Sequence, residues 1–167
     1  DSEHLEAVND ALARIEALIE DVLQLARQGQ PVEETDRVSL GAIARAAWGM
    51  VETAQAELIV EADRDLVVDP DRLQRLFENL FRNSIEHGGE DVTVTVGDLE
   101  DGDGFFIEDD GVGIPEGDRE QVFDSGYSTA EDGTGFGLAI VEQIVAAHEW
   151  EIDLADITGG TRFEIRT

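Results

Sequence analysis

The stretch from residue 70 to residue 88 constrains the fold most, because it reads as a helix with a single apolar face. Asp69 followed by Pro70 is typical of a helix start, since aspartate caps the first turn and proline is tolerated there. One arc carries large apolar side chains and a serine: Leu73, Leu76, Phe77, Leu80 and Ser84. This arc has to pack against another element, so we predict a helix laid on a sheet.

Strand and helix patterns surround this helix in an order that limits the possible architectures. Runs of apolar residues predict short strands at 57–62, 65–69, 92–98, 104–109, 151–156 and 162–167. Helical periodicity predicts further helices at 3–28, 40–52 and 136–148. The order lacks the repeated βαβ units of a doubly wound fold. We therefore predict an α+β fold, a two-layer α/β sandwich with helices on one face of a mainly antiparallel sheet.

The first predicted helix has the apolar spacing of a coiled-coil seam, alternately three and four residues. The seam residues are Leu5, Val8, Leu12, Ile15, Ile19, Val22 and Ala26. No second helix of matching length follows, so we favour half of a helical bundle over a helix folded back on the domain. We accordingly divide the chain into a partial bundle helix (1–28), a polar linker (29–37) and a globular domain (38–167).

Charge is the most unusual bulk property of the chain. There are 40 acidic residues against 11 basic ones, all of them arginine, and the formal net charge is −29. The acids are spread evenly and the apolar periodicity is intact, which excludes a disordered acidic tail. At about 1 M salt the screening length falls to about 3 Å, which would relieve the self-repulsion. We therefore predict a halophilic protein.

The composition also argues against several sites and partners. A negative field repels phosphate backbones, so we expect no nucleic-acid partner. The chain has no cysteine and only three histidines, which excludes thiolate metal sites and disfavours a zinc cluster. No apolar run approaches the roughly 18 residues of a membrane span. We expect this part to be cytoplasmic and any membrane attachment of the parent protein to lie in upstream segments.

Two glycine-rich segments allow the backbone to approach a ligand closely. In residues 105–115 a strand runs into Asp109, Gly111 and Gly113, where a carboxylate can accept a hydrogen bond from the exocyclic amine of adenine. In residues 132–141 alternating glycines open a helix, whose free N–H groups suit phosphates. Taken alone, the first pattern is also explained by an ordinary turn, and the second is not specific.

Asn79, Asn83 and Glu86 form a polar row along the edge of the apolar arc. Asparagine is a poor helix former, so two of them four residues apart indicate that amides are needed there. A solvated flank of the helix is the alternative explanation.

The order of these segments resembles the catalytic ATP-binding domain of sensor histidine kinases, in the superfamily shared with gyrase, mismatch-repair ATPases and a heat-shock chaperone. The resemblance covers the whole chain, including a first helix, ending IEDVLQLAR, that is similar to the second helix of the dimerisation and histidine-phosphotransfer bundle. Its motifs are ENLFRNSIEHG (N box), DDGVGIP (first glycine box), VFDSGYST (F box) and GTGFGLAIVEQIVAAH (second glycine box). The implied fold is the Bergerat-type ATP-binding fold, with ATP and Mg²⁺ as cofactors.

The resemblance implies a role for each matching position. Asn83 would coordinate the Mg²⁺ that bridges the phosphates, with Asn79 lining the same pocket. Asp109 would accept from the adenine amine. The other positions would form the wall beside the base (Gly111, Gly113 and Ile114), the phosphate-facing backbone (Gly135, Gly137 and Leu138) and the back of the adenine site (Thr161).

The N box departs from the family pattern at two positions. Glu86 stands where lysine is common, and His87, which we place among the ligand-binding positions, replaces the usual aromatic residue. Phosphate neutralisation would be weaker as a result, unless Arg82, Arg119 or abundant cations compensate.

Two further segments are interpreted through the resemblance. Residues 115–134, with Phe123 and Tyr127, are similar to the mobile lid over the nucleotide. Glu149 and Trp150 replace the glycine pair usual after the last helix, which leaves the form of that turn open.

The implied activity is that of a protein-histidine kinase in two-component signalling. The chain would be the ATP-binding catalytic part, transferring the γ-phosphoryl group of ATP to a histidine upstream, so that the parent is a phosphoprotein. His4 and His148 lack the sequence context of an acceptor, and Asn79 is a pocket candidate rather than a catalytic residue. The implied partners are a second copy, through the bundle helix, and a response regulator.

Two other functions stay open. A gyrase-type ATP hydrolase resembles this fold but uses a glutamate four residues before the metal-binding asparagine, where this chain has Asn79. Glu78 is one residue away and points about 100 degrees around the helix. A non-catalytic nucleotide-binding interaction module is the second alternative, suggested by Glu86 and by the few cations near the expected lid.

We predict that the domain is stable in molar KCl and loosens on dilution, because the charge of −29 loses its screening. A salt series from about 0.1 to 3 M, followed by circular dichroism, measures this, and a rising melting temperature is expected. A melting temperature that does not respond to salt would contradict the halophilic interpretation.

Overall fold

The computed structural model describes residues 1–28, 30–32, 34–51, 53, 55–114, 117, 137–155 and 157–167. Its helices are α1 (Ser2–Gln28), α2 (Leu40–Gly49), α3 (Pro70–Gly88) and α4 (Gly137–Ala147). Its strands are β1 (Asp36–Ser39), β2 (Glu57–Val60), β3 (Asp65–Val68), β4 (Thr93–Asp98), β5 (Gly104–Asp109), β6 (Glu151–Ala155) and β7 (Thr161–Arg166). The predicted helices and strands are present, with small differences at their ends.

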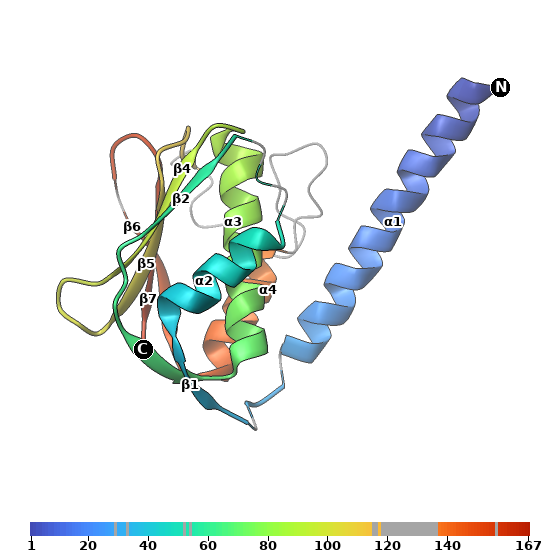
Figure 1. Ribbon diagram of the computed structural model, residues 1–167. Helices are drawn as coiled ribbons and strands as arrows, with labels where there is room; N and C mark the ends of the chain where they lie inside the picture. Colours follow the sequence, from blue (N-terminus) through green and yellow to red (C-terminus); the bar gives the residue numbers. More distant parts are fainter. Residues whose placement is uncertain are drawn as a thin grey trace.

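The larger sheet has five strands in the order β2-β4-β5-β7-β6. β2 pairs parallel with β4, and the other neighbouring strands of this sheet are antiparallel. Helices α2, α3 and α4 lie against one face of the sheet (Figure 1). The predicted fold class, a two-layer α+β sandwich with a mainly antiparallel sheet, is confirmed.

A smaller, two-stranded sheet lies at the start of the domain. β1 pairs antiparallel with β3, from Asp36 opposite Val68 to Ser39 opposite Asp65. The strand therefore takes up Asp36 and Arg37, which we expected to be the end of the linker. Because main-chain pairing holds β1 while most of its side chains are exposed, it lacks the apolar alternation that identifies a strand. The division into bundle helix, linker and domain stays a prediction.

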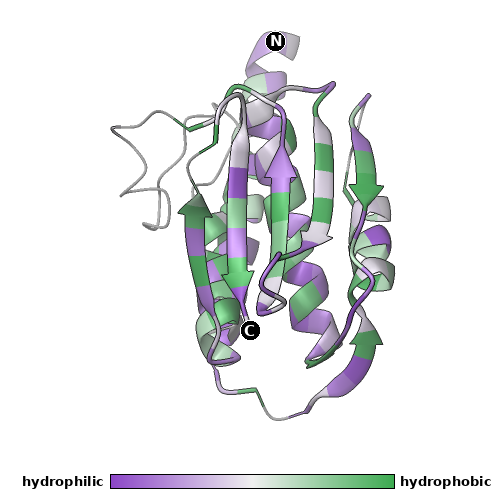
Figure 2. Cartoon of the chain, turned by 90° about the vertical axis from the view of Figure 1, so that its left-hand side faces the viewer, coloured by the Kyte–Doolittle hydropathy of each residue, from purple (hydrophilic) through white to green (hydrophobic). Residues whose placement is uncertain are grey.

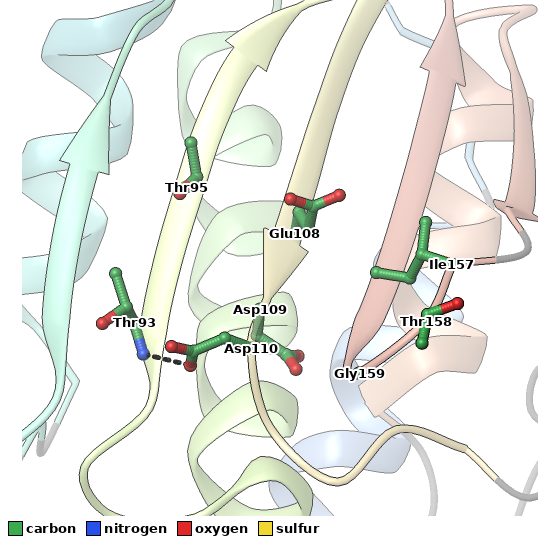
Figure 3. A pocket seen from close by; sticks show the side chains of 8 residues that line it. All are labelled: Thr93, Thr95, Glu108, Asp109, Asp110, Ile157, Thr158 and Gly159. Atoms are coloured by element: carbon green, nitrogen blue, oxygen red, sulfur yellow. Dashed lines mark hydrogen bonds between the residues drawn. The ribbon is translucent and has the colours of Figure 1, made fainter.

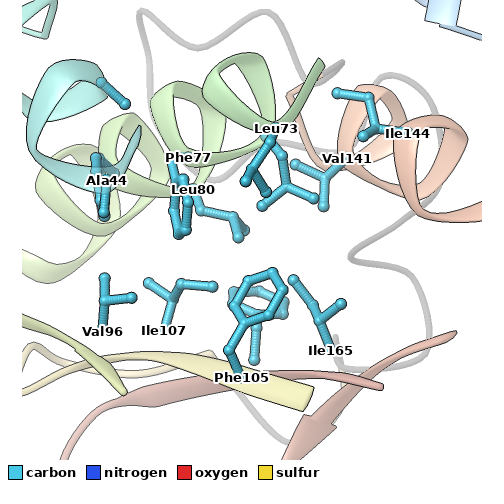
Figure 4. Packing of buried hydrophobic residues seen from close by; sticks show 14 of the residues in the cluster. Ala44, Leu73, Phe77, Leu80, Val96, Phe105, Ile107, Val141, Ile144 and Ile165 are labelled. Atoms are coloured by element: carbon cyan, nitrogen blue, oxygen red, sulfur yellow. The ribbon is translucent and has the colours of Figure 1, made fainter. Parts of the chain in front are cut away.

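The apolar arc of α3 packs against the inward-facing side chains of the sheet (Figure 4). Phe77 is fully buried, and its ring centroid lies 5.8 Å from that of Phe105 on β5 and 5.5 Å from that of Phe81. Strand alternation separates these inward positions from polar outward ones, as the stripes in Figure 2 show. The buried positions of β5 and β7 include Phe105, Ile107 and Asp109, and Thr161, Phe163 and Ile165.

The turn after α4 forms without the glycine pair that the resemblance suggests. Glu149 adopts a left-handed conformation with a φ of 61°. Its N–H donates to the Ala146 carbonyl at 3.0 Å, and the Trp150 N–H donates to the Val145 carbonyl at 2.9 Å, which is the pattern of a Schellman cap. The Trp150 ring then stacks on His148, with centroids 4.4 Å apart. A tryptophan thus covers the end of the core beside α4.

Helix α1 projects away from the domain (Figure 1). Its seam is largely exposed, from 64% of the surface of Leu5 to 45% of Val22. Leu25, near the end of the helix, packs against the domain core. Because the seam does not lie along the domain, it remains available for another helix. Within the described ranges, no helix combines the length and apolar character required to span a membrane.

Candidate functional site

Asp109 lies at the end of β5 with its side chain on the helix side of the sheet, and only 5% of its surface is exposed. Its Oδ1 atom accepts a hydrogen bond from the Gly111 N–H at 3.0 Å. The Ser84 side chain and the Thr161 main chain also hydrogen-bond to the carboxylate. A carboxylate in an ordinary surface turn would be exposed, so the burial of Asp109 argues against that explanation of the D-x-G-x-G pattern.

Main-chain segments meet so closely around Asp109 that no side chain fits between them. A Cβ atom on Gly111 would lie 2.6 Å from the main-chain oxygen of Gly88, at the end of α3. A Cβ atom on Gly160 would overlap the main-chain oxygen of Asp109. Gly113 has a φ of 78°, and a Cβ atom there would lie 2.8 Å from the Gly160 oxygen. The end of α3, the segment after β5 and the start of β7 therefore form one backbone wall beside the carboxylate.

Burial raises the pKa of Asp109 above the usual value of 3.8, because desolvation penalises the charged form. Hydrogen bonds from Gly111, Ser84 and Thr161 oppose this rise without cancelling it. Since the pKa is higher in the folded chain than in the unfolded one, ionised Asp109 destabilises the fold at neutral pH. The penalty disappears as the pH falls through the raised pKa toward 3.8.

His87 is half-buried on α3 close to Asp109. Burial lowers the pKa of its imidazole below 6.5, and the negative charge of Asp109 opposes that shift. At neutral pH the side chain is therefore mainly uncharged. It provides a polar group at this end of the site and little positive charge for a phosphate.

Asn79 lies near the start of α4 and is 5% exposed. Its Nδ2 atom donates to the Arg75 carbonyl at 2.8 Å, and its Oδ1 atom takes no part in that hydrogen bond. A Cβ atom on Gly137, the first residue of α4, would lie 3.4 Å from this Oδ1 atom. The first N–H groups of a helix have no partner within the helix. An amide oxygen of α3 thus lies beside the N-terminus of α4.

Asn83 lies one turn further along α3 and is half-buried. Among the residues that the structure describes, its side chain forms no hydrogen bond. Residues four apart share one side of a helix, so the two amides lie next to each other. The burial of Asn79 argues against a solvated flank at that position.

Three polar side chains follow one another at intervals of four residues along α3: Asn79, Asn83 and His87. We call these three side chains the amide row, after its two asparagines. At 1.5 Å per residue the row is about 12 Å long. It runs from the N-terminus of α4, which favours anions, to the buried acceptor Asp109. An extended ligand with an anionic group at one end and a hydrogen-bond donor at the other fits this order.

A hollow of about 270 Å³ lies by the other face of the sheet, and Asp109 is among the residues that line it (Figure 3). The carboxylates of Glu108 and Asp110 line it together with Thr93 and Thr95. The Asp110 Oδ1 atom accepts from the Thr93 N–H at 2.7 Å. Because two carboxylates would repel an anionic ligand, we do not assign the nucleotide to this hollow.

The structure describes some, but not all, of the other residues predicted to form the site. Ile114 is half-buried and packs against the core, and Leu138 is buried in the first turn of α4. Gly135 lies outside the described residues, as do Phe123 and Tyr127 of the expected lid.

The sequence interpretation missed three residues that contact Asp109 or its neighbours: Ser84, Gly88 and Gly160. The helical periodicity places Ser84 in the apolar arc, although its position next to Asn83 indicates that it borders the site. Gly88 and Gly160 belong to two glycine pairs at element ends, and such pairs signal either a sharp turn or a close backbone approach.

Residues 68–167 match the family described as histidine kinase-, DNA gyrase B-, and HSP90-like ATPase. The chain belongs to this ATPase family. The matched range contains the whole amide row, Asp109 and the backbone wall. Membership implies ATP binding, and the order of groups along α3 is compatible with a nucleoside triphosphate.

Individual relatives are sensor histidine kinases. The chain is 36% identical to the sensor histidine kinase ZraS of Escherichia coli O157:H7 over 104 residues, which cover 60% of this chain and 23% of ZraS. It is 29% identical to the sensor histidine kinase CpxA of Escherichia coli K12 over 186 residues, covering 99% of this chain and 39% of CpxA. The histidine kinase AdeS of Acinetobacter baumannii shares the fold, with a TM-score of 0.76 at 18% identity over 99% of this chain and 84% of that one.

We predict that Gly111→Ala destabilises this ATPase-family domain by about 1–3 kcal/mol, because the new methyl group forces the backbone wall apart. Urea unfolding in high salt measures the effect. Gly49→Ala is the matched control, since a Cβ atom there has nothing within 4 Å. Equal unfolding midpoints for the two variants would contradict the wall geometry.

Proposed function

We propose that this chain is the ATP-binding catalytic part of a two-component sensor histidine kinase. In the whole protein, the γ-phosphoryl group of ATP would pass to the imidazole of a histidine outside this stretch. A phosphorus–nitrogen bond forms as the bond to the β-phosphate oxygen breaks and ADP leaves. The observation that carries the proposal is the amide row between a helix N-terminus and a buried carboxylate, in a chain whose relatives are sensor histidine kinases.

Asp109 would recognise the base. Adenine has an exocyclic amine that donates hydrogen bonds, and an ionised carboxylate is an acceptor only. The backbone wall of Gly111, Gly113 and Gly160 would let a flat ring lie against the main chain, with Thr161 behind it. Removing a partner from a buried acceptor is unfavourable, so this contact would favour adenine over bases without an amine at that position.

The other end of the amide row would bind the phosphates, with Asn83 as a ligand of Mg²⁺. Amide oxygens suit a hard cation, and Mg²⁺ when bound would neutralise charge on the phosphates. Asn79 and the N-terminus of α4 would hold phosphate oxygens in place. The row itself carries little positive charge at neutral pH, because burial lowers the pKa of its histidine, and this supports a role for a metal ion.

Transfer to a protein is favoured over hydrolysis by the residue at position 79. A gyrase-type hydrolase needs a carboxylate base there, and Asn79 uses its Nδ2 atom to bind the Arg75 carbonyl. Glu78 is buried, but on a helix it points about 100 degrees away from its neighbour.

The exposed seam of α1 would pair with the helix that carries the acceptor histidine and with a second copy of the chain. A response regulator would then receive the phosphoryl group. The chain spans at most 39% of the two curated relatives described above, so sensing and any membrane attachment would belong to other segments of the parent.

We predict that Asp109→Asn abolishes ATP binding or weakens it at least about tenfold, because the base loses a charged acceptor. Asn83→Ala should instead remove most of the dependence on Mg²⁺. Calorimetric titration with and without Mg²⁺ measures both effects. Affinity should also fall on acidification at a pH above that expected for an ordinary aspartate, since the pKa of Asp109 is raised.

Asp110→Asn is the matched control, because this neighbouring carboxylate faces the hollow on the other side of the sheet. It should bind ATP like the parent chain. Unchanged affinity in Asp109→Asn would remove the adenine assignment.

We also predict that the chain alone binds Mg-ATP but does not become labelled from γ-labelled ATP. Adding the upstream acceptor helix, in a longer protein at high salt, should produce acid-labile phosphohistidine. Label on His4, His87 or His148 of the chain alone would overturn the proposed acceptor. A longer protein that binds ATP without becoming labelled would favour the non-catalytic module.

A further inference from the structure

The guanidinium of Arg72, in the first turn of α3, joins the segment after α1 to the domain. Its Nη1 atom donates to the Gln30 carbonyl at 2.5 Å and its Nη2 atom to the Pro31 carbonyl at 3.4 Å. Its Nε atom lies 3.3 Å from the Asp69 Oδ2 atom. The Arg72 side chain is only 14% exposed, which is low for an arginine. The fixed fork of a guanidinium suits simultaneous contacts with several oxygens better than a single ammonium group does.

Asp69 extends this connection to α4. Its Oδ1 atom accepts from the main-chain N–H groups of Asp71 and Arg72, which caps α3. Its own N–H donates to the Nε2 atom of His148 at 3.2 Å. The His148 Nδ1 atom is 2.9 Å from the Ile144 carbonyl, so Nδ1 carries the proton and Nε2 is the acceptor. We call this set of groups the linker clasp: the carbonyl groups of Gln30 and Pro31 and the three residues Arg72, Asp69 and His148.

The linker clasp contacts both helices of the candidate site away from the ligand. α3 carries the amide row beyond its first turns, and α4 presents its other end to Asn79. α1 itself projects outward, and Leu25 is the seam neighbour that packs against the core (Figure 1). α1 also lies against α4, while most of its surface is exposed, so the direction of this long helix depends on a small contact region near its end.

We propose that Arg72 is a positioning residue, which sets the direction of α1 relative to the nucleotide site through the linker clasp. It would act on phosphoryl transfer by orienting the bundle toward the γ-phosphate, without touching the nucleotide. The contacts alone support the role of Arg72 in orienting α1. The effect on phosphoryl transfer rests on the proposed function.

The absence of cysteine makes a distance measurement straightforward. Spin labels on Glu6→Cys in α1 and Asp153→Cys in β6, both at exposed positions, report the direction of the helix. Mixing the labelled protein with an excess of unlabelled chain suppresses distances between spin labels on different copies. The doubly labelled chain should give one distance distribution, and Arg72→Gln in the same background should shift or broaden it clearly. An unchanged distribution would overturn the proposal.

Two further variants separate the linker clasp from a general loss of stability. Asp69→Asn keeps a residue that can cap α3 but removes the ion pair to Arg72, so it should give an intermediate broadening. Arg37→Gln removes another arginine–aspartate pair near the linker, Arg37 with Asp65 at 3.5 Å, and should leave the distribution unchanged. Equal broadening in Arg37→Gln and Arg72→Gln would overturn the proposal.

In the parent protein, Arg72→Gln should lower the rate of histidine labelling about tenfold while the affinity for ATP stays the same. A loss of ATP affinity equal to the loss of rate would show that Arg72 acts through the pocket and would overturn the positioning role. Failure of the unsubstituted parent to bind ATP would overturn the proposed function, whereas the distance measurement tests the linker clasp without any nucleotide.

Discussion

The contact between Phe77 and Phe105 determines where the polar residues of the candidate site lie. It fixes the rotation of α3 on the sheet, so the amide row emerges at the border of the core. The same contact fixes the phase of β5, since Phe105 faces inward and strand alternation then turns Asp109 inward as well. The helical period of α3 and the alternation of β5 meet at Phe77 and Phe105. Together they bring the amide row and the buried carboxylate of Asp109 to one side of the sheet.

The features that follow from local periodicity could be predicted from the sequence. The apolar arc of α3, the alternation of β5 and the capping of α3 by Asp69 each depend on a few neighbouring residues, and all are present in the structure. The burial of Asn79 and Asp109 agrees with their selection as site residues, because a polar group at the edge of an apolar pattern borders the core. Their roles in binding a nucleotide stay predictions.

Contacts between distant segments could not be predicted in this way. β1 pairs with β3 through its main chain, and its four residues, three of them exposed, carry no apolar pattern that predicts a partner strand. Nothing in the local sequence of His148 indicates a partner, yet its ring accepts a hydrogen bond from the Asp69 N–H because the start of α3 lies beside the end of α4. Glu149 adopts a conformation that favours glycine, since the hydrogen bonds of the cap and the packing of Trp150 offset the strain.

As the proposed adenine acceptor, the buried carboxylate of Asp109 would also link the folding equilibrium to the occupancy of the site. An unoccupied pocket holds a partly desolvated charge, so the empty fold is less stable than its apolar core alone would make it. A molecule that binds only the folded chain adds about 2.7 kcal/mol of stability at a hundred times its dissociation constant. A domain of marginal stability would therefore spend more of its time folded when adenine nucleotides are abundant, and its resistance to proteolysis would rise and fall with the nucleotide supply of the cell.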